Sequence, residues 1–175
     1  LYRYQADDLS NGVAIGSFDF AVLGASADGS RVTIRQSLDF PAEVVQYNAS
    51  TGSFDNTPIT LGLLKYGPVM DRAATRFILG RENVYGANYI QQGSLPAAVP
   101  VVMSPDGTKA YCFVGGTTLR TYDLAASPVA GLFPEIGTGT TLPGDPGADA
   151  KIIISPDGGT LFIAGADGIV VVPTP

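Results

Sequence analysis

The side chains that could carry out chemistry in this sequence are mainly carboxylates. There are 16 Asp and Glu residues, and two neighbouring carboxylates can act as general acid and base, or bind a hard cation such as Ca²⁺ together with carbonyl oxygens. The most suggestive pair is Asp145 and Asp149, in the Gly- and Pro-rich stretch LPGDPGADAK. The pair lacks the alternating acid spacing of an EF-hand loop. A solvated loop is therefore the preferred interpretation, and a Ca²⁺ site the alternative.

Composition excludes several other kinds of site. The sequence has no histidine, which removes Ser-His and Cys-His nucleophile pairs and every zinc site that needs an imidazole. The single cysteine, Cys112, can form neither an internal disulfide nor a thiolate cluster. It lies between aromatic residues in AYCFV, which predicts a buried and unreactive thiol. No phosphate-binding loop of the GxxxxGK(S/T) type is present, and no cofactor is expected.

The charge and hydropathy pattern limits the partners. The net charge is −6 and the ten Lys and Arg residues are scattered along the chain, so we expect no nucleic-acid partner. No apolar stretch approaches the roughly 18 residues of a membrane helix, and no membrane insertion is expected. The composition is 45% hydrophobic and 15% charged, with 22 Gly and 13 Pro. Such a composition favours one all-β domain rich in tight turns.

The sequence contains a repeated unit built around such a turn. The stretch VVMSPDGTKAYCF begins at Val101, and IIISPDGGTLFI begins at Ile152. SADGSRVTI at residues 26–34 is a shorter version, and MDRAATRFIL at residues 70–79 is a degenerate copy. Aligned on these turns, the units recur about every 43 residues. Because Pro, Asp and Gly together reverse the chain, each unit contains several short antiparallel strands, and this pattern predicts a β-propeller.

The repeat also carries a family likeness. Residues 101–127 and 151–173 resemble the bacterial YVTN-type propeller repeat, which is related to the WD40-like and TolB-type Ser-Pro-Asp-Gly repeats. The resemblance implies an exported, periplasmic or surface-exposed protein in which the propeller binds or scaffolds. Some similar propellers are lactonases or metal-dependent hydrolases. Their acid–base set includes His, so it cannot be carried over to a chain that has none.

We expect about four blades, each a four-stranded antiparallel sheet. The approximate units are residues 17–64, 65–98, 99–136 and 148–175, while residues 1–16 complete a neighbouring or closing blade. In the third unit the strands are expected at 99–104, 109–114, 119–123 and 129–136. Three arrangements remain open: the chain is part of a larger ring, it pairs with a copy of itself to complete a ring, or it closes alone.

One face of the propeller is the expected binding face. The loops between the second and third strands lie there, together with the loops that connect one blade to the next, and these loops differ in length from blade to blade. Such variable loops on a regular scaffold commonly carry function. The candidate ligand-binding residues on this face are Arg35, Asp39, Phe40, Arg81, Glu82, Asp145 and Asp149. No catalytic residue is assigned.

These observations favour a non-catalytic binding or scaffold module with a protein or carbohydrate partner. A carboxylate- or metal-dependent hydrolase or lyase is the first alternative, since the acidic residues do not exclude it. A structural spacer or self-assembly unit is the second. The resemblance indicates an extracellular, periplasmic or cell-surface location. A homodimer, or a remaining part of the propeller, is the partner expected if the four blades do not close alone.

Overall fold

The computed structural model describes most of the chain. The described residues are 2–5, 8–14, 22–36, 42–55, 59–61, 67–80, 82–96, 100–113, 116–147, 150–166 and 168–174. Every regular element within these ranges is a β-strand. The expected all-β class is therefore confirmed.

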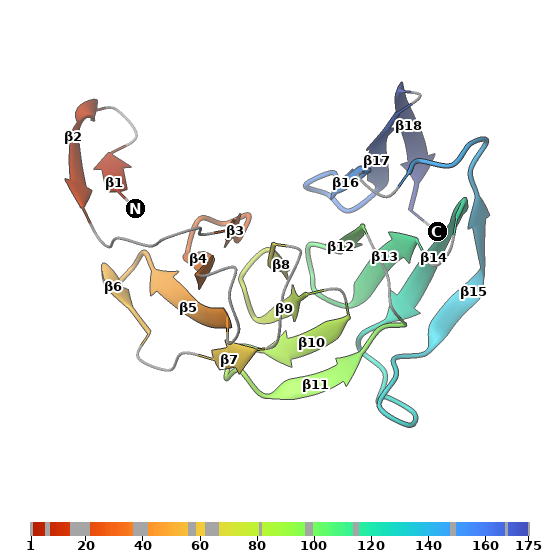
Figure 1. The fold of residues 1–175 in the computed structure, drawn as a ribbon, viewed down its shortest axis with the longest axis horizontal. Helices are drawn as coiled ribbons and strands as arrows, with labels where there is room; N and C mark the ends of the chain where they lie inside the picture. Colours follow the sequence, from red (N-terminus) through yellow and green to blue (C-terminus); the bar gives the residue numbers. More distant parts are fainter. Residues whose placement is uncertain are drawn as a thin grey trace.

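The strands form four small antiparallel sheets in chain order, preceded by a hairpin (Figure 1). The hairpin pairs β1 (Tyr2–Gln5) with β2 (Asp8–Ala14). The first sheet contains β3 (Val22–Ala25), β4 (Arg31–Gln36), β5 (Ala42–Asn48), β6 (Ser53–Phe54) and β7 (Ile59–Leu61). The second contains β8 (Val69–Met70), β9 (Arg76–Leu79), β10 (Asn83–Gly86) and β11 (Gln91–Ser94).

The third sheet contains β12 (Val101–Met103), β13 (Lys109–Phe113), β14 (Thr118–Asp123) and β15 (Glu135–Thr141). The fourth contains β16 (Lys151–Ile154), β17 (Thr160–Gly165) and β18 (Gly168–Pro173). Strands that follow one another in the sequence pair in each sheet, which is the antiparallel meander of a propeller blade, and in the first sheet β7 pairs with β5 in addition. The predicted β-propeller with about four blades is confirmed, and the sheets are called the first to fourth blades below.

The Ser-Pro-Asp-Gly turn joins the first two strands of a blade through its own side chains. In the third blade, Ser104 Oγ donates to Asp106 Oδ1 at 2.6 Å and accepts the N–H of Lys109 at 2.9 Å. The same carboxylate oxygen accepts the N–H of Thr108 at 3.0 Å. Gly107 has a φ of 71°, a left-handed conformation that glycine adopts without a steric cost. Hydrogen bonds within the turn therefore stabilise its conformation.

The second blade makes this turn with different residues. Asp71 takes the place of the serine, is buried, and accepts the N–H of Thr75 at 2.8 Å on Oδ1. Ala74 occupies the glycine position with a φ of 52°, which costs about 1–2 kcal/mol for a residue with a Cβ. The degenerate copy at residues 70–79 is therefore a true member of the repeat, with one strained residue.

Main-chain hydrogen bonds connect these turns from blade to blade. The N–H of Asp28 donates to the carbonyl of Arg72 at 3.1 Å, and the N–H of Arg72 donates to the carbonyl of Pro105 at 2.9 Å. The innermost strands of neighbouring blades, β3, β8, β12 and β16, lie within 8 Å of one another in that order, measured between Cα atoms. The blades thus follow an arc with these strands on its inner side (Figure 1).

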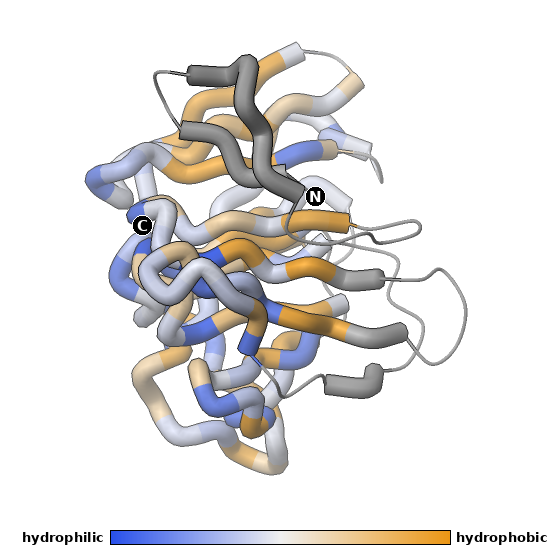
Figure 2. The backbone as a smooth tube through the Cα atoms, turned by 90° about the vertical axis from the view of Figure 1, so that its left-hand side faces the viewer, coloured by the Kyte–Doolittle hydropathy of each residue, from blue (hydrophilic) through white to orange (hydrophobic). Residues whose placement is uncertain are grey.

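The core consists of apolar layers between successive blades. Val44 of the first blade packs with Phe77, Leu79 and Tyr85 of the second. A larger layer joins the second and third blades, and a further one joins the third and fourth. Figure 2 shows the apolar stretches within the stacked strands and hydrophilic turns at one edge. Tyr47 and Tyr122 are buried in the blades.

The outer strand of the third blade differs from the sequence prediction. It was expected at residues 129–136, but β15 runs from Glu135 to Thr141, and Leu132 forms isolated bridges with Val129 and with Ser94 of the second blade. Its pairing with β14 shifts register between Leu119 and Thr121. Gly137 and Gly139 both have positive φ within this strand. A Gly-containing bulge therefore extends the strand through a stretch that reads as a loop.

The arc does not close on itself in the part of the chain that the structure describes. No strand of the fourth blade has a Cα atom within 8 Å of a strand of the first blade or of the β1–β2 hairpin. Both ends of the arc lie on the same side of the molecule (Figure 1). The outer side of the fourth blade is consequently left without a neighbouring blade among the described residues.

Candidate functional site

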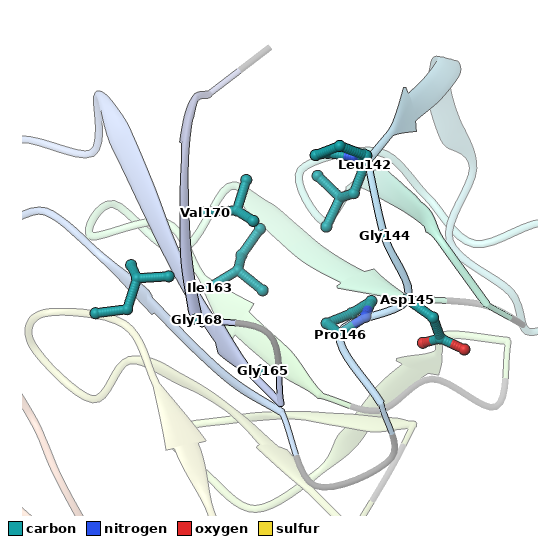
Figure 3. Close-up of a pocket in the computed structure, with 10 residues that line it drawn as sticks. Leu142, Gly144, Asp145, Pro146, Ile163, Gly165, Gly168 and Val170 are labelled. Carbon is teal, nitrogen blue, oxygen red and sulfur yellow. The ribbon is translucent and has the colours of Figure 1, made fainter.

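A pocket of about 250 Å³ lies at the junction of the third and fourth blades. One wall is the loop that follows β15, at residues 142–146, and the other is the end of β17 with the start of β18 (Figure 3). The loop connects one blade to the next, and the opposite wall flanks the turn between second and third strands. Both belong to the face that the sequence analysis selected for binding.

The loop wall is held in place by backbone contacts. Leu142 is buried, and its N–H donates to the carbonyl of Thr117 at 2.9 Å, which ties the loop to the turn of the third blade. A Cβ added to Gly165 would lie 2.6 Å from the carbonyl oxygen of Pro146. Gly165 therefore permits a close approach of loop and strand that any side chain would prevent. The pocket is formed by the fold and does not need a ligand to shape it.

The pocket is mainly apolar. Ile163, Val170 and Leu142 belong to the layer between the third and fourth blades, and their side chains reach its floor and walls (Figure 3). Pro143, Pro146 and the exposed Ile169 line it as well. Walls of this kind accept an aliphatic or aromatic group by desolvation.

Asp145 is the predicted site residue that lines this pocket. Its Oδ1 accepts the N–H of Gly147 at 2.8 Å, so the carboxylate stabilises the loop. Figure 3 shows the carboxylate directed away from Ile163 and Val170. Asp145 therefore places a negative charge at the outer rim, where it can act on a ligand only at the pocket entrance.

None of the other predicted site residues that the structure describes lines this pocket. Glu82 is half-buried between β9 and β10, and its main-chain carbonyl accepts the N–H of Leu95 at 2.8 Å. The backbone of Arg35 lies in β4, paired with Val22 and Val44. The predictions at Asp39, Phe40, Arg81 and Asp149 fall outside the described residues.

The apolar lining was not predicted as a site. The candidates selected from the sequence were mostly polar loop residues, whereas the walls are built by Leu142, Ile163 and Val170. The available signal was the pair of prolines, Pro143 and Pro146, beside an unequal blade-connecting loop. Prolines restrict φ and hold a loop in one conformation, which suits a preformed wall.

A second hollow of about 250 Å³ lies on the opposite face, between the Asp-Gly turns of the third and fourth blades. Asp106 and Asp157 line it, but their carboxylates are already used: Asp157 Oδ1 accepts from Ser155 Oγ at 2.5 Å and from the N–H of Gly159 at 3.0 Å. These bonds lower the pKa of Asp157, with the Ser155 hydroxyl as the main cause. The turns explain these acids without a ligand.

Two further observations concern the described residues. No three of their His, Cys, Asp and Glu side chains gather closely enough to bind a metal ion. They also contain no helix long and apolar enough to span a membrane. Cys112 is fully buried, and burial is the main cause that raises the pKa of its thiol to about 12. The predicted burial of this cysteine is confirmed.

Comparison with known proteins supports the fold and does not assign a function. No protein-family model matches the chain, and none of the curated proteins does. A crystal structure of a functionally unknown protein from Desulfotomaculum acetoxidans is similar, with a TM-score of 0.67 and 14% sequence identity. The match covers 94% of this chain and 55% of that one, so the chain spans about half the length of the solved protein. At this identity the likeness shows the fold alone, in agreement with the β-propeller arrangement described above.

Proposed function

We propose that the chain is a non-catalytic binding module of the YVTN-like propeller type, and that its pocket between the third and fourth blades takes an apolar side chain of a protein partner. The observation that carries the proposal is the pocket itself. It lies on the variable-loop face, has about 250 Å³ of space and has aliphatic walls. That space is slightly below the usual range for drug-sized ligands and suits one large side chain.

The charge distribution supports the choice of partner. With a net charge of −6 and Asp145 exposed at the rim, the face favours neutral or basic partner segments over acidic ones. A carbohydrate would need hydrogen-bonding side chains in the pocket, and the lining supplies only one polar side chain, that of Asp145. An apolar peptide side chain is the better match.

The resemblance of the repeat to bacterial YVTN-type propellers supports an exported or surface-exposed location for this module. The propeller in such a protein is a rigid support for its loops. Its partner would be recognised at the loop face while the Asp-Gly turns hold the opposite face together.

The proposal is tested by methyl NMR with short capped peptides. The probes are Ac-Gly-Leu-Gly-NH₂ and Ac-Gly-Phe-Gly-NH₂, with Ac-Gly-Ser-Gly-NH₂ as the polar comparison. One buried side chain contributes about 2–3 kcal/mol, so millimolar or weaker binding is expected. The Leu and Phe peptides should shift the methyl signals of Ile163 and Val170, and the Ser peptide should leave them unchanged.

Two matched variants locate the effect. Gly144→Phe places a large ring in the loop wall, and the peptide-dependent shifts should disappear. Ala27→Phe places the same ring on an exposed turn of the opposite face, and the shifts should persist. Equal responses to the Leu and Ser peptides, or shifts retained in Gly144→Phe with its fold intact, would disprove binding at this pocket.

A further inference from the structure

The walls of the pocket between the third and fourth blades consist largely of backbone and rigid rings. Half of its ten lining residues are glycine or proline: Pro143, Gly144, Pro146, Gly165 and Gly168. Glycine leaves bare main chain that a ligand can approach closely, and proline presents a rigid five-membered ring. A planar group contacts such walls over its whole face, whereas a branched group contacts them at a few points. An aromatic ring therefore suits these walls better than a branched aliphatic side chain.

The space in the pocket also suits an aromatic ring. An apolar cavity of about 150 Å³ holds one benzene molecule, and this pocket offers about 250 Å³. The additional space accommodates a second fused ring, as in an indole. Ile163 and Val170 supply aliphatic side chains on the wall opposite the loop (Figure 3). A tryptophan side chain therefore fills the pocket more completely than a leucine side chain, and the larger apolar area that it buries favours its binding.

One charged group lies at the entrance of the pocket. Asp145 is exposed, and its Oδ1 accepts the N–H of Gly147 at 2.8 Å. Its Oδ2 has no partner among the described residues, whose two ion pairs do not include Asp145. Because the carboxylate is directed away from Ile163 and Val170 (Figure 3), it meets the part of a ligand that stays outside the pocket. A carboxylate in that position favours a cationic group.

We infer, on the basis of the proposed function, that the partner segment carries an aromatic residue, with tryptophan as the best fit, next to a lysine or arginine. The ring occupies the pocket, and the basic side chain extends over the rim to Oδ2 of Asp145. Lysine and arginine have long apolar stems, so the charged group reaches the rim while the stem lies along the wall. The net charge of −6 also favours the approach of a basic segment.

Two comparisons in the methyl NMR titration test the ring and the charge separately. Affinities are taken from the concentration dependence of the Ile163 and Val170 signals. Ac-Gly-Trp-Gly-NH₂ should bind about fivefold more tightly than Ac-Gly-Leu-Gly-NH₂, because it buries more apolar area. Ac-Lys-Trp-Lys-NH₂ should bind about threefold more tightly than the Trp peptide at low salt, as expected for an exposed ion pair. This gain from lysine should largely disappear in about 0.5 M NaCl, which screens the pair.

Matched variants assign the charge effect to one carboxylate. Asp145→Asn keeps an oxygen that accepts the N–H of Gly147 and replaces Oδ2 by an amide nitrogen that only donates, so the gain from lysine should be lost. Asp106→Asn makes the same change of charge in a turn of the opposite face, where Oδ1 also accepts a main-chain N–H two residues later. The gain from lysine should persist in Asp106→Asn.

The outcomes distinguish a failure of this inference from a failure of the proposed function. Equal affinity for the Leu and Trp peptides would overturn the choice of an aromatic residue, although an apolar side chain would still bind. A gain from lysine that persists in Asp145→Asn with its fold intact, or that is lost equally in Asp106→Asn, would overturn the pairing with Asp145. No signal change with any of the peptides would overturn the proposed function as well.

Discussion

At the residue scale, the repeated acids belong to the turns. Asp28, Asp106 and Asp157 each accept a neighbouring serine hydroxyl and a main-chain N–H two residues later. This role follows from the sequence, since Asp forms such turns on its own backbone. The buried Asp71 was harder to foresee, because it takes the position that serine holds in the other blades. Residue-level chemistry therefore explains the turns fully.

Alanine substitutions at two turn glycines should separate the cost of a positive φ from the cost of a steric clash of the added Cβ. Gly29 has a φ of 73° with open space around it, so Gly29→Ala should cost about 1 kcal/mol of unfolding free energy. Gly107 has a φ of 71°, and an added Cβ would lie 2.7 Å from Asp71 Oδ2. Gly107→Ala should therefore cost about 2–3 kcal/mol. Urea unfolding measures both, and equal losses would show that the contact with Asp71 is unimportant.

The turn acids predict a loss of stability in acid. Hydrogen bonds from Ser104 and Thr108 lower the pKa of Asp106 below its ordinary value of 3.8. Its contribution is complete above that value and is lost as pH falls through the lower pKa of the folded state. Asp106→Asn keeps an acceptor oxygen that does not titrate, so stability should fall less between pH 5 and pH 2 than in the parent. Parallel pH curves would contradict this.

Cys112 should be unreactive in the native protein. Burial raises the pKa of its thiol to about 12, so neither thiolate nor access is available at pH 8. Ellman's reagent should give no colour with the native chain and one thiol per chain in denaturant. Rapid labelling without denaturant would mean that the layer between the second and third blades opens readily.

At the element scale, alternation along β17 distinguishes its two faces. Leu161 and Ile163 are fully buried against the third blade, whereas Phe162 between them is 38% exposed. The sequence shows an apolar strand and predicts burial on both sides. Only the arrangement of blades reveals which side has a neighbour. The misplaced β15 has a similar cause, since its bulged glycines look like loop residues until their pairing with β14 is known.

Two substitutions on β17 should therefore behave differently. Leu161→Ala removes a fully buried side chain from the layer with the third blade and should cost about 2–5 kcal/mol at any protein concentration. Phe162→Ala removes a side chain that is 38% exposed on the other face of the strand, and it should cost less, about 1 kcal/mol. Thermal unfolding of the two variants tests this. An equal loss of stability from both substitutions would place Phe162 in the core as well.

The sequence predicted the face of the propeller on which the candidate site lies, but it did not predict the apolar character of that site. The repeat places the variable loops on one side of the propeller, and the pocket lies there beside Asp145. Its apolar walls depend on how the residues 142–146 approach Gly165, a contact between segments far apart in sequence. Single-sequence patterns identify strands and turns, whereas such a pocket depends on tertiary packing.

At the scale of the whole molecule, the four blades form an arc whose ends are left open. Three of its layers are filled by blades of the same chain, and a fourth apolar surface has no partner among the described residues. An exposed apolar surface of this kind usually marks an interface.

The measurement that tests this account most directly is a titration with Ac-Gly-Leu-Gly-NH₂, followed through the methyl signals of Ile163 and Val170 in the pocket between the third and fourth blades. The account predicts peptide-dependent shifts of these signals that disappear in Gly144→Phe and persist in Ala27→Phe. Signals that do not move, or that move equally with Ac-Gly-Ser-Gly-NH₂, would contradict it.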